Sequence, residues 1–456
     1  MPHDRRTTLF ATLGILLTSA LVWTCIWVQP YASAFIRNKH LVFAASDIDS
    51  APRQTIAPSN LPLTTAPGFD ITLFAEGIDG ARGIHHSPFG LVISSPKRGE
   101  VYLLQDSNND GRADQTMTLL SGLNRPSGIT ASDKWLYIAE TDAIVRLELA
   151  QLANATVKDK TPDGSKEKDR DTASERIAHF PGGGNHWRRA IGIGPDKQLY
   201  VAVGSTCNVC IETDPHRAVI LRFNPEGSAA ETEAEIVATG IRNSAGFDWN
   251  PNDQQLYATE NGRDWLGDDF PPDELNRVEH GGFYGWPYVN GGSAQQAPVS
   301  DPDFGNHPNA QHQTSIPPVH HFRAHNAPLG IRFNRSDRLP AKYQRSAFVA
   351  LHGSWNRSEP DGYKVVALIW TEQGIVEEDF VTGFLSSDQL SPDPSSPKGG
   401  VYGRPAELTQ APNGDLYITD DYRGRIYRVA YRGDVNNSVG GGFSKGSAKN
   451  TAIEAP

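Results

Sequence analysis

Basic and imidazole side chains recur at one position along the chain, each shortly before a run rich in β-forming residues. Guanidinium groups pair well with carboxylates, and histidine can exchange a proton near neutral pH. If the fold gathers these side chains, they form a site for a compact ligand with several negative charges; the alternative is ordinary salt bridges between neighbouring elements. The recurring residues are Arg82, Arg125, His186, Arg242, His325 and Arg404.

His186 is the candidate for a catalytic base. It lies in the segment 184–196, next to Arg188 and Arg189. A neutral imidazole can accept a proton from a substrate hydroxyl, and nearby positive charges help to keep it unprotonated at neutral pH. A lone histidine is more often structural, but its place in the recurring set favours the catalytic interpretation.

Carboxylates and glycines are dense between residues 260 and 276. Ca²⁺ takes about six to eight oxygen ligands from carboxylates and backbone carbonyls in a flexible geometry. The segment therefore predicts a calcium site that includes Asp273 and Glu274.

A second acidic loop, residues 106–114, matches the first nine positions of a calcium-binding loop, with Asp106, Asn108 and Asp110 at ligand positions. Its twelfth position is Met117, so the usual bidentate glutamate is missing. A structural calcium site and a polar hairpin turn are both compatible with this pattern.

The chain has three cysteines, and Cys25 lies in an apolar N-terminal run, which leaves Cys207 and Cys210 as a pair. No histidine follows them, so covalent haem attachment is excluded. Outside the cytoplasm this spacing favours a disulfide, with a redox role as the alternative.

The elements that must position these residues repeat six times as a turn followed by a short β-rich run, often with Leu-Tyr. Two all-β folds are compatible with this repeat, a β-sandwich and a six-bladed β-propeller. The basic residues that accompany each run favour the propeller, because its innermost strands would direct these residues to one mouth of the central channel. The six runs are 89–93, 133–138, 196–201, 253–258, 346–350 and 413–418.

The N-terminus reads as an export signal. Residues 9–28 are apolar, Arg5 and Arg6 precede them, and small residues follow, so 1–34 is predicted to be a cleaved signal peptide or an anchor helix in the inner membrane. We predict a linker over 35–67, the propeller over 68–432 and a disordered tail over 433–456. The body of the protein is then periplasmic or otherwise extracytoplasmic.

Composition excludes several protein classes. The 456 residues carry a formal charge of −11, which disfavours nucleic-acid binding. The hydrophobic fraction of 38% rises to about 47% with the 43 glycines, which is typical of globular proteins and excludes collagen, coiled coil and wholesale disorder. With 43 glycines and 32 prolines the chain must turn often, so a helical bundle is disfavoured.

Several motifs in order resemble the quinoprotein glucose/sorbosone dehydrogenase family over about residues 68–430. They are Asn-His at 185–186, Gly-Ile-Arg-Asn at 240–243, Asp-Glu-Leu-Asn at 273–276, Gly-Gly-Phe-Tyr-Gly-Trp-Pro at 281–287 and Gly-Arg-Pro at 403–405. Segments 350–357 and 362–366 are most similar to the sorbosone-dehydrogenase-like branch. The resemblance implies a six-bladed propeller that uses pyrroloquinoline quinone (PQQ) with Ca²⁺.

The resemblance also implies roles for single residues. His186 would be the general base, Arg242, Asn243 and Arg404 would contact PQQ, and the carbonyls of Gly262 and Arg263 would hold the Ca²⁺. The glucose-oxidising branch has a lysine on the fifth blade and a pair of arginines on the sixth. This chain has Trp-Asn-Arg at 355–357 in place of the lysine and the single Arg404 in place of the pair. Arg357 is the candidate substitute and Arg82 a further cofactor contact, while a flat wall for the cofactor would come from Trp355, Tyr284 or Trp265.

The sequence as a whole predicts an exported PQQ-dependent dehydrogenase that oxidises a sugar, sugar aldehyde or polyol by hydride transfer to PQQ. No haem motif is present, so an external quinone or cytochrome would accept the electrons. The alternatives are a Ca²⁺-dependent lactonase-type hydrolase and a propeller without cofactor that binds a carbohydrate or a protein.

Overall fold

The computed structural model describes residues 61–158, 174–227, 234–293, 295–386 and 400–433. The predicted signal or anchor segment, the linker up to residue 60 and the tail from residue 434 lie outside these ranges. Within the described ranges, no helix combines the length and apolar character that a membrane span requires.

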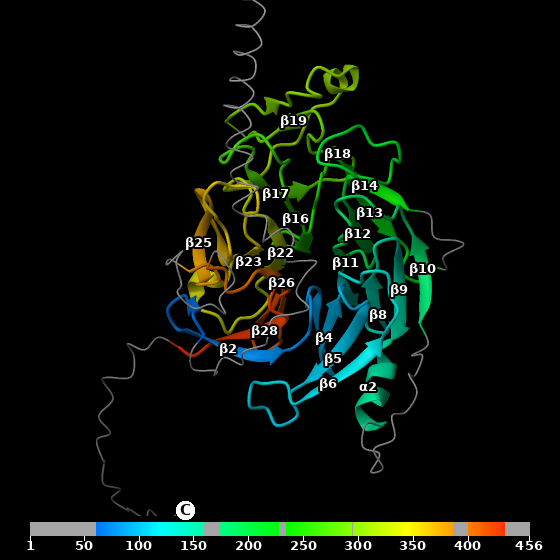
Figure 1. Cartoon of the computed structure of the whole chain (residues 1–456), viewed down its shortest axis with the longest axis vertical. Coiled ribbons are helices and arrows are strands. Elements are labelled where there is room, and N and C mark those ends of the chain that lie inside the picture. Colours follow the sequence, from blue (N-terminus) through cyan, green and yellow to red (C-terminus); the bar gives the residue numbers. More distant parts are fainter. Residues whose placement is uncertain (1–60, 159–173, 228–233, 294, 387–399, 434–456) are drawn as a thin grey trace, which may run out of the picture.

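Six antiparallel blades of four strands are arranged around a central axis in the described part of the chain (Figure 1). Two of these sheets carry a fifth short strand, and a two-stranded sheet lies outside the blades. The first blade contains β3 (Ile84–Ser87), β4 (Gly90–Ser95), β5 (Glu100–Gln105) and β6 (Gln115–Leu120), and the second β7 (Ile129–Ala131), β8 (Trp135–Ala139), β9 (Ala143–Glu148) and β10 (Glu175–His179). The third contains β11 (Ile191–Ile193), β12 (Leu199–Val203), β13 (Val219–Phe223) and β14 (Glu235–Thr239), and the fourth β15 (Gly246–Trp249), β16 (Leu256–Glu260), β17 (Asp273–Val278) and β21 (His320–Phe322).

The last two blades close the ring. The fifth contains β22 (Pro328–Phe333), β23 (Ser346–Leu351), β24 (Lys364–Thr371) and β25 (Gly374–Thr382). The sixth contains β26 (Pro405–Gln410), β27 (Leu416–Asp420) and β28 (Arg425–Tyr431), and its outer strand is β2 (Phe69–Glu76) from the other end of the chain. Because each innermost strand contacts the next and β26 contacts β3, the predicted six-bladed propeller is confirmed.

The repeated sequence units have a simple structural meaning. Each β-rich run is the second strand of a blade: β4, β8, β12, β16, β23 or β27. Each recurring basic residue stands just before an innermost strand, as Arg242 does before β15 and Arg404 before β26. The repeated β-rich runs therefore predicted the number of blades. The repeated basic residues predicted that they all lie at the end of the channel where the innermost strands start.

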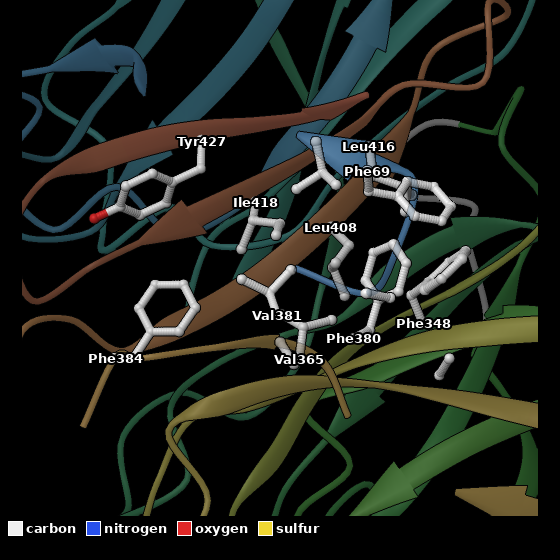
Figure 2. Close-up of a cluster of buried hydrophobic side chains, with 14 of the residues drawn as sticks. Phe69, Phe348, Val365, Phe380, Val381, Phe384, Leu408, Leu416, Ile418 and Tyr427 are labelled. Carbon is white, nitrogen blue, oxygen red and sulfur yellow. The ribbon is translucent and has the colours of Figure 1, made fainter. Parts of the chain in front are cut away.

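The blades hold together through apolar clusters between adjacent sheets. One cluster joins the fifth and sixth blades, where Phe69 of β2 packs edge-on against Phe380 of β25, with Phe348 of β23 beside it (Figure 2). Second strands such as β12, Leu-Tyr-Val-Ala-Val, are buried along their whole length. Such continuous apolar runs are typical of strands covered on both faces.

Three features differ from or add to the predicted organisation. Residues 61–67 were predicted as the end of a linker, but β1 (Thr64–Thr65) pairs with β25, because Leu61 and Leu63 pack on the apolar cluster below. The helix α2 (Leu149–Lys158) follows β9. Between β17 and β21 the chain makes the short strands β18 (Gly282–Phe283), β19 (Val289–Asn290) and β20 (Val299–Ser300).

Candidate functional site

A cavity of about 450 Å³ opens at the end of the channel where the innermost strands begin. This volume lies within the usual range for small-molecule sites. Three of its side chains belong to the recurring set, namely His186, Arg242 and His325. The loops that follow β12, β16 and β23 supply much of the remaining wall, with Asn208, Asn261, Gly262, Asp264, Trp265, Trp355 and Asn356.

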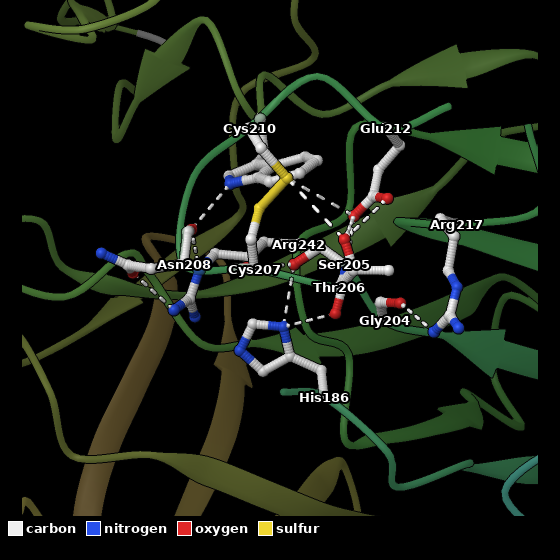
Figure 3. The surroundings of a disulfide bond; sticks show 11 residues. His186, Gly204, Ser205, Thr206, Cys207, Asn208, Cys210, Glu212, Arg217 and Arg242 are labelled. Atoms are coloured by element: carbon white, nitrogen blue, oxygen red, sulfur yellow. Dashed lines mark hydrogen bonds between the residues drawn. A yellow bond between two sulfur atoms is a disulfide. The ribbon is translucent and has the colours of Figure 1, made fainter. Parts of the chain in front are cut away.

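His186 has one ring nitrogen fixed and the other unengaged. Its Nδ1 lies 2.8 Å from Oγ and 3.0 Å from the carbonyl oxygen of Ser205 (Figure 3). Because the Ser205 hydroxyl donates its proton to the Cys207 carbonyl, its oxygen accepts from His186, and Nδ1 carries the hydrogen. Among the described residues no hydrogen bond involves Nε2, so this nitrogen has a free lone pair at the cavity wall.

The surroundings of His186 keep the ring neutral. Burial, and then the positive charge of Arg242, hold the pKa of His186 well below its ordinary value of 6.5. The hydrogen bond to the Ser205 carbonyl acts in the opposite direction but is the weaker influence. At neutral pH His186 is therefore able to accept a proton.

The dependence of activity on pH should reveal this environment. The basic form of His186 is lost as the pH falls through its pKa, so activity should decline only well below pH 6.5. Ser205→Asp places a carboxylate beside Nδ1, which raises the pKa of His186 and moves this decline to higher pH. The measurement is kcat/KM against pH, with Ser205→Ala as the control, because it keeps the carbonyl contact and adds no charge. A decline that stays in place in Ser205→Asp would show that His186 is not the titrating base.

Arg242 ties three loops together. Its guanidinium donates to the carbonyl oxygen of Asn208 at 2.9 Å, to Oδ1 of the same residue at 2.8 Å and to the carbonyl of Asn261 at 3.0 Å. It also forms an ion pair of 2.9 Å with Asp264. Only 4% of its side chain is exposed, so these contacts fix a buried positive charge at the cavity wall.

The disulfide Cys207–Cys210 lies in the loop that positions both groups (Figure 3). Ser205, just before it, orients His186, and Asn208, inside it, holds Arg242. The loop is further fixed where Thr206 donates to Glu212 and Trp286 Nε1 donates to the Asn208 carbonyl at 3.2 Å. Sequence reasoning predicted the cysteine pair but missed Ser205 and Asn208, because serine and asparagine in a loop carry no distinguishing signal.

A chain of hydrogen bonds continues from Arg242 across the cavity wall. Asn356 donates to Oδ1 of Asp264 at 2.9 Å and to Nδ1 of His325 at 3.2 Å, while Nε2 of His325 donates to the Gly267 carbonyl at 2.8 Å. Both nitrogens of His325 are thus engaged, and burial lowers its pKa. His325 is therefore suited to hold the wall in place, whereas His186 can act on a ligand.

Backbone conformation at this cavity is unusual. Trp265, His325 and Ala327 have positive φ angles of 74°, 65° and 54° although none is glycine. Such conformations cost about 1 kcal/mol or more each and concentrate at functional sites. All three residues line the cavity, which supports its assignment as the functional site.

The predicted calcium ligands separate into two groups. Asp273 lines the cavity, where its oxygens accept the backbone N–H groups of Gly262 and Ala327 at 2.8 Å each, and burial raises its pKa to about 7. Glu274 is the next residue on β17, so it points to the other face and lies beside Glu260 and Asn276. Asp273 and Glu274 therefore do not share one site.

The carbonyl groups predicted to hold Ca²⁺ are compatible with that role. Gly262 lines the cavity, and no hydrogen bond among the described residues ends on its carbonyl or on that of Arg263. The Arg263 side chain turns away, where it is 6% exposed and pairs with Asp301 at 2.7 Å and Asp303 at 3.0 Å. A hard cation accepts such carbonyl oxygens as ligands.

Aromatic rings form one wall of the cavity. Trp355 and Trp265 both line it, and they meet edge to face with ring centres 5.2 Å apart. Tyr284, the third candidate from the sequence, is instead buried between the third and fourth blades, where its hydroxyl donates to the Arg277 carbonyl. Tyr284 therefore does not reach the cavity, because its ring is part of the apolar cluster between these two blades.

Four arginines expected at the site lie outside this cavity, three of them held by oxygen acceptors and one by an aromatic ring. Arg82 pairs with Asp421 and Arg125 stacks 3.8 Å from the centre of the Trp187 ring. Arg404 donates to the carbonyls of His352 and Gly353. Arg357, proposed as the substitute for the fifth-blade lysine, is buried and pairs with Asp269 at 3.0 Å. The six recurring residues thus lie at the same end of the channel, but only His186, Arg242 and His325 share the cavity, and the other three belong to separate contacts.

The loop 106–114 satisfies its own oxygens. The Asp106 carboxylate accepts the N–H groups of Asp110 and Gly111, Asn108 Oδ1 accepts that of Asp110, and Asp110 accepts that of Arg112. The loop connects β5 to β6, and these contacts are compatible with both interpretations, a polar hairpin turn and a structural calcium site. In the described part of the chain, one set of three His, Cys or acidic groups converges, namely Cys207, Cys210 and Glu212. The two cysteines of this set form a disulfide with each other.

The chain matches two family models. The model described as Glucose / Sorbosone dehydrogenase covers residues 127–355, and one described as TrAA12-like covers residues 290–432. An uncharacterized protein of Borreliella burgdorferi is 31% identical over 400 residues, which are 86% of this chain and 95% of that protein.

Solved structures of similar fold include sugar-oxidising enzymes. A calcium structure of a Trichoderma reesei carbohydrate-active enzyme of family AA12 is 19% identical, with a TM-score of 0.65, and covers 84% of this chain and 99% of its own. The holo PQQ domain of pyranose dehydrogenase from Coprinopsis cinerea is 18% identical, with a TM-score of 0.62, and covers 83% and 98%. The soluble aldose sugar dehydrogenase of Escherichia coli is 16% identical, with a TM-score of 0.53, and covers 80% and 100%. At these identities the likeness shows a shared fold.

Proposed function

Because the chain belongs to the glucose/sorbosone dehydrogenase family, we propose that it is a PQQ-dependent dehydrogenase that oxidises a sugar, sugar aldehyde or polyol. The observation that carries this proposal is the state of His186, a neutral imidazole whose Nδ1 is held by Ser205 and whose Nε2 is unengaged at the wall of a cavity of about 450 Å³. This is the arrangement that a general base requires.

The cavity fits a flat, polyanionic cofactor in three respects. Trp355 and Trp265 offer an aromatic wall, the buried Arg242 and the half-buried Asn243 offer nitrogen donors, and the free carbonyl of Gly262 offers an oxygen ligand for a cation. When bound, PQQ would supply the two-electron acceptor for a hydride. We assign the cofactor contacts to Arg242, Asn243 and Trp355, and the Ca²⁺ contacts to the carbonyls of Gly262 and Arg263.

The protein's own part in the reaction is positioning and proton transfer. Nε2 of His186 accepts the hydroxyl proton of the substrate, while Nδ1 keeps its hydrogen, donates it to the Ser205 oxygens and so fixes the plane of the ring. Arg242 lowers the pKa of His186, so the ring is ready to act before the substrate arrives. His325 and Asn356 keep Asp264, and through it Arg242, in place.

The N-terminal segment and the lack of a haem motif support a proposal on the location and the electron acceptor. We propose that the N-terminal signal or anchor segment carries the propeller out of the cytoplasm, and that a quinone or cytochrome collects the electrons there. The disulfide Cys207–Cys210 is in keeping with an oxidising compartment.

Reconstitution tests this function. The purified full-length protein is incubated with PQQ and Ca²⁺, desalted, and assayed with aldoses, sorbosone and polyols and an artificial dye acceptor. Turnover that requires both PQQ and Ca²⁺ is expected. Hydrolysis of a sugar lactone without PQQ would favour the hydrolase alternative, and carbohydrate binding without turnover or retained PQQ would favour the binding-protein alternative.

A further inference from the structure

A second cavity, of about 370 Å³, lies at the opposite end of the channel. Its wall comes from residues within the innermost strands and from the turns after β11 and β15, whereas the first cavity is lined by the loops before the innermost strands. Residues of β3, β7, β11, β15 and β22 take part, so the cavity surrounds the channel axis.

An ion pair separates this far cavity from the site of His186. Arg188, just before β11, pairs with Glu407 of β26, and their side chains are 5% and 14% exposed. These residues come from the third and sixth blades, which lie opposite each other in the ring. The pair therefore crosses the channel, and the far cavity is a site of its own.

The polar half of the far cavity has an incompletely satisfied positive charge. Asp248 forms two hydrogen bonds of 2.7 and 2.8 Å with Arg335, which neutralise that arginine. Arg332 stands only 3.7 Å from Asp248, and its other contacts are long bonds of 3.3 and 3.4 Å to the Leu408 carbonyl. Two arginines thus share Asp248, and the next carboxylate to Arg332, that of Glu407, is already paired with Arg188.

His85 adds an unused polar group beside Arg332. The His85 ring lines the cavity, and none of the side-chain hydrogen bonds among the described residues involves it. Burial, Arg332 and His86 hold the pKa of His85 near 3, so the ring is neutral and can donate one N–H. A ligand with an oxygen anion would satisfy both His85 and Arg332.

The other half of the cavity is apolar. Ile129, Ile191 and Ile193 line it together with Trp249. Trp249 lies directly on the backbone of β11, since a Cβ at Gly192 would stand 2.9 Å from its ring. This half provides an apolar surface for a carbon skeleton, which a small inorganic anion would leave unused.

We propose that the far cavity binds a small organic carboxylate, with its carboxylate on Arg332 and His85 and its carbon skeleton against Trp249. Guanidinium groups recognise carboxylates through paired hydrogen bonds, and the net charge of the facing Arg332, Arg335 and Asp248 side chains is positive in an otherwise acidic protein. This ligand site is independent of the PQQ site.

Calorimetric titration of the full-length protein with benzoate tests the proposal. One benzoate should bind per chain, and inorganic phosphate at equal ionic strength should bind at least about 10-fold more weakly. Arg332→Gln should weaken benzoate binding by about 10-fold or more, since it removes a charged hydrogen-bonding partner. Arg338→Gln, at an exposed position beyond the cavity, is the matched control and should leave binding unchanged.

Other variants separate the two cavities. Thr130→Phe fills the far cavity without changing a charge and should abolish benzoate binding at an unchanged melting temperature, which keeps the test valid if Arg332→Gln fails to fold. His186→Ala should leave benzoate binding unchanged, whatever its effect on sugar oxidation. Absence of saturable binding, equal affinity for phosphate, or loss of binding in His186→Ala rather than Arg332→Gln would overturn the proposal.

Discussion

Replacing His186 by alanine is expected to lower kcat by about 10²- to 10⁴-fold while PQQ remains bound. The expectation rests on Nε2 being the free ring nitrogen at the cavity wall, with Nδ1 held by Ser205. The side chain contributes no other described hydrogen bond, so its removal leaves the network of Arg242 intact. The measurement is single-turnover reduction of the bound cofactor by substrate.

Two controls distinguish proton transfer from a structural role. Added imidazole should restore part of the rate of His186→Ala, because a small base can enter the space that the side chain leaves. His280→Ala, at an exposed side chain paired with Glu235, should behave like the unaltered protein. Undiminished turnover in His186→Ala with full cofactor occupancy would remove His186 from the mechanism.

The second large effect is expected at Arg242. Arg242→Met removes a buried cation and leaves Asp264 without its partner, so the free energy of unfolding should fall by about 3 kcal/mol. PQQ binding should weaken by about 10-fold or more, because a charged donor to the cofactor is lost. Thermal unfolding and equilibrium dialysis of PQQ measure the two effects separately.

The double variant Arg242→Met/Asp264→Asn separates the two roles of Arg242. A neutral amide at position 264 can still accept from Asn356 and no longer needs a cation, so part of the lost stability should return. PQQ binding should stay weak, because the cofactor still lacks its partner. Recovery of both stability and PQQ binding would show that Arg242 serves the fold alone.

The blade architecture was predictable because it depends on local signals that repeat. A β-rich run such as 413–418 and a basic residue such as Arg404 before the innermost strand recur in six copies, and each copy reports the same position in a blade. The N-terminal closing strand β2 was not identified, since pairing with β28 joins distant parts of the chain.

Some residues face the cavity because of their position in the blade repeat, and these residues of the candidate site could be predicted from the sequence. His186 and Arg242 meet there as predicted, and Asn243, Gly262, Asp273 and Trp355 line the same cavity. Side chains whose direction depends on a distant acceptor could not be placed from spacing. Arg357 is the clearest case, because Asp269 and the carbonyl of Ala324, in other loops, hold it away from the cavity.

The central claim is that the cavity beside His186 holds the cofactor, and a crystal structure of the full-length protein with PQQ and Ca²⁺ tests it most directly. The account predicts PQQ in that cavity, against Trp355, with Nε2 of His186 facing its ring system and the Gly262 carbonyl on the cation. PQQ bound elsewhere, or this cavity empty at saturating PQQ, would contradict it.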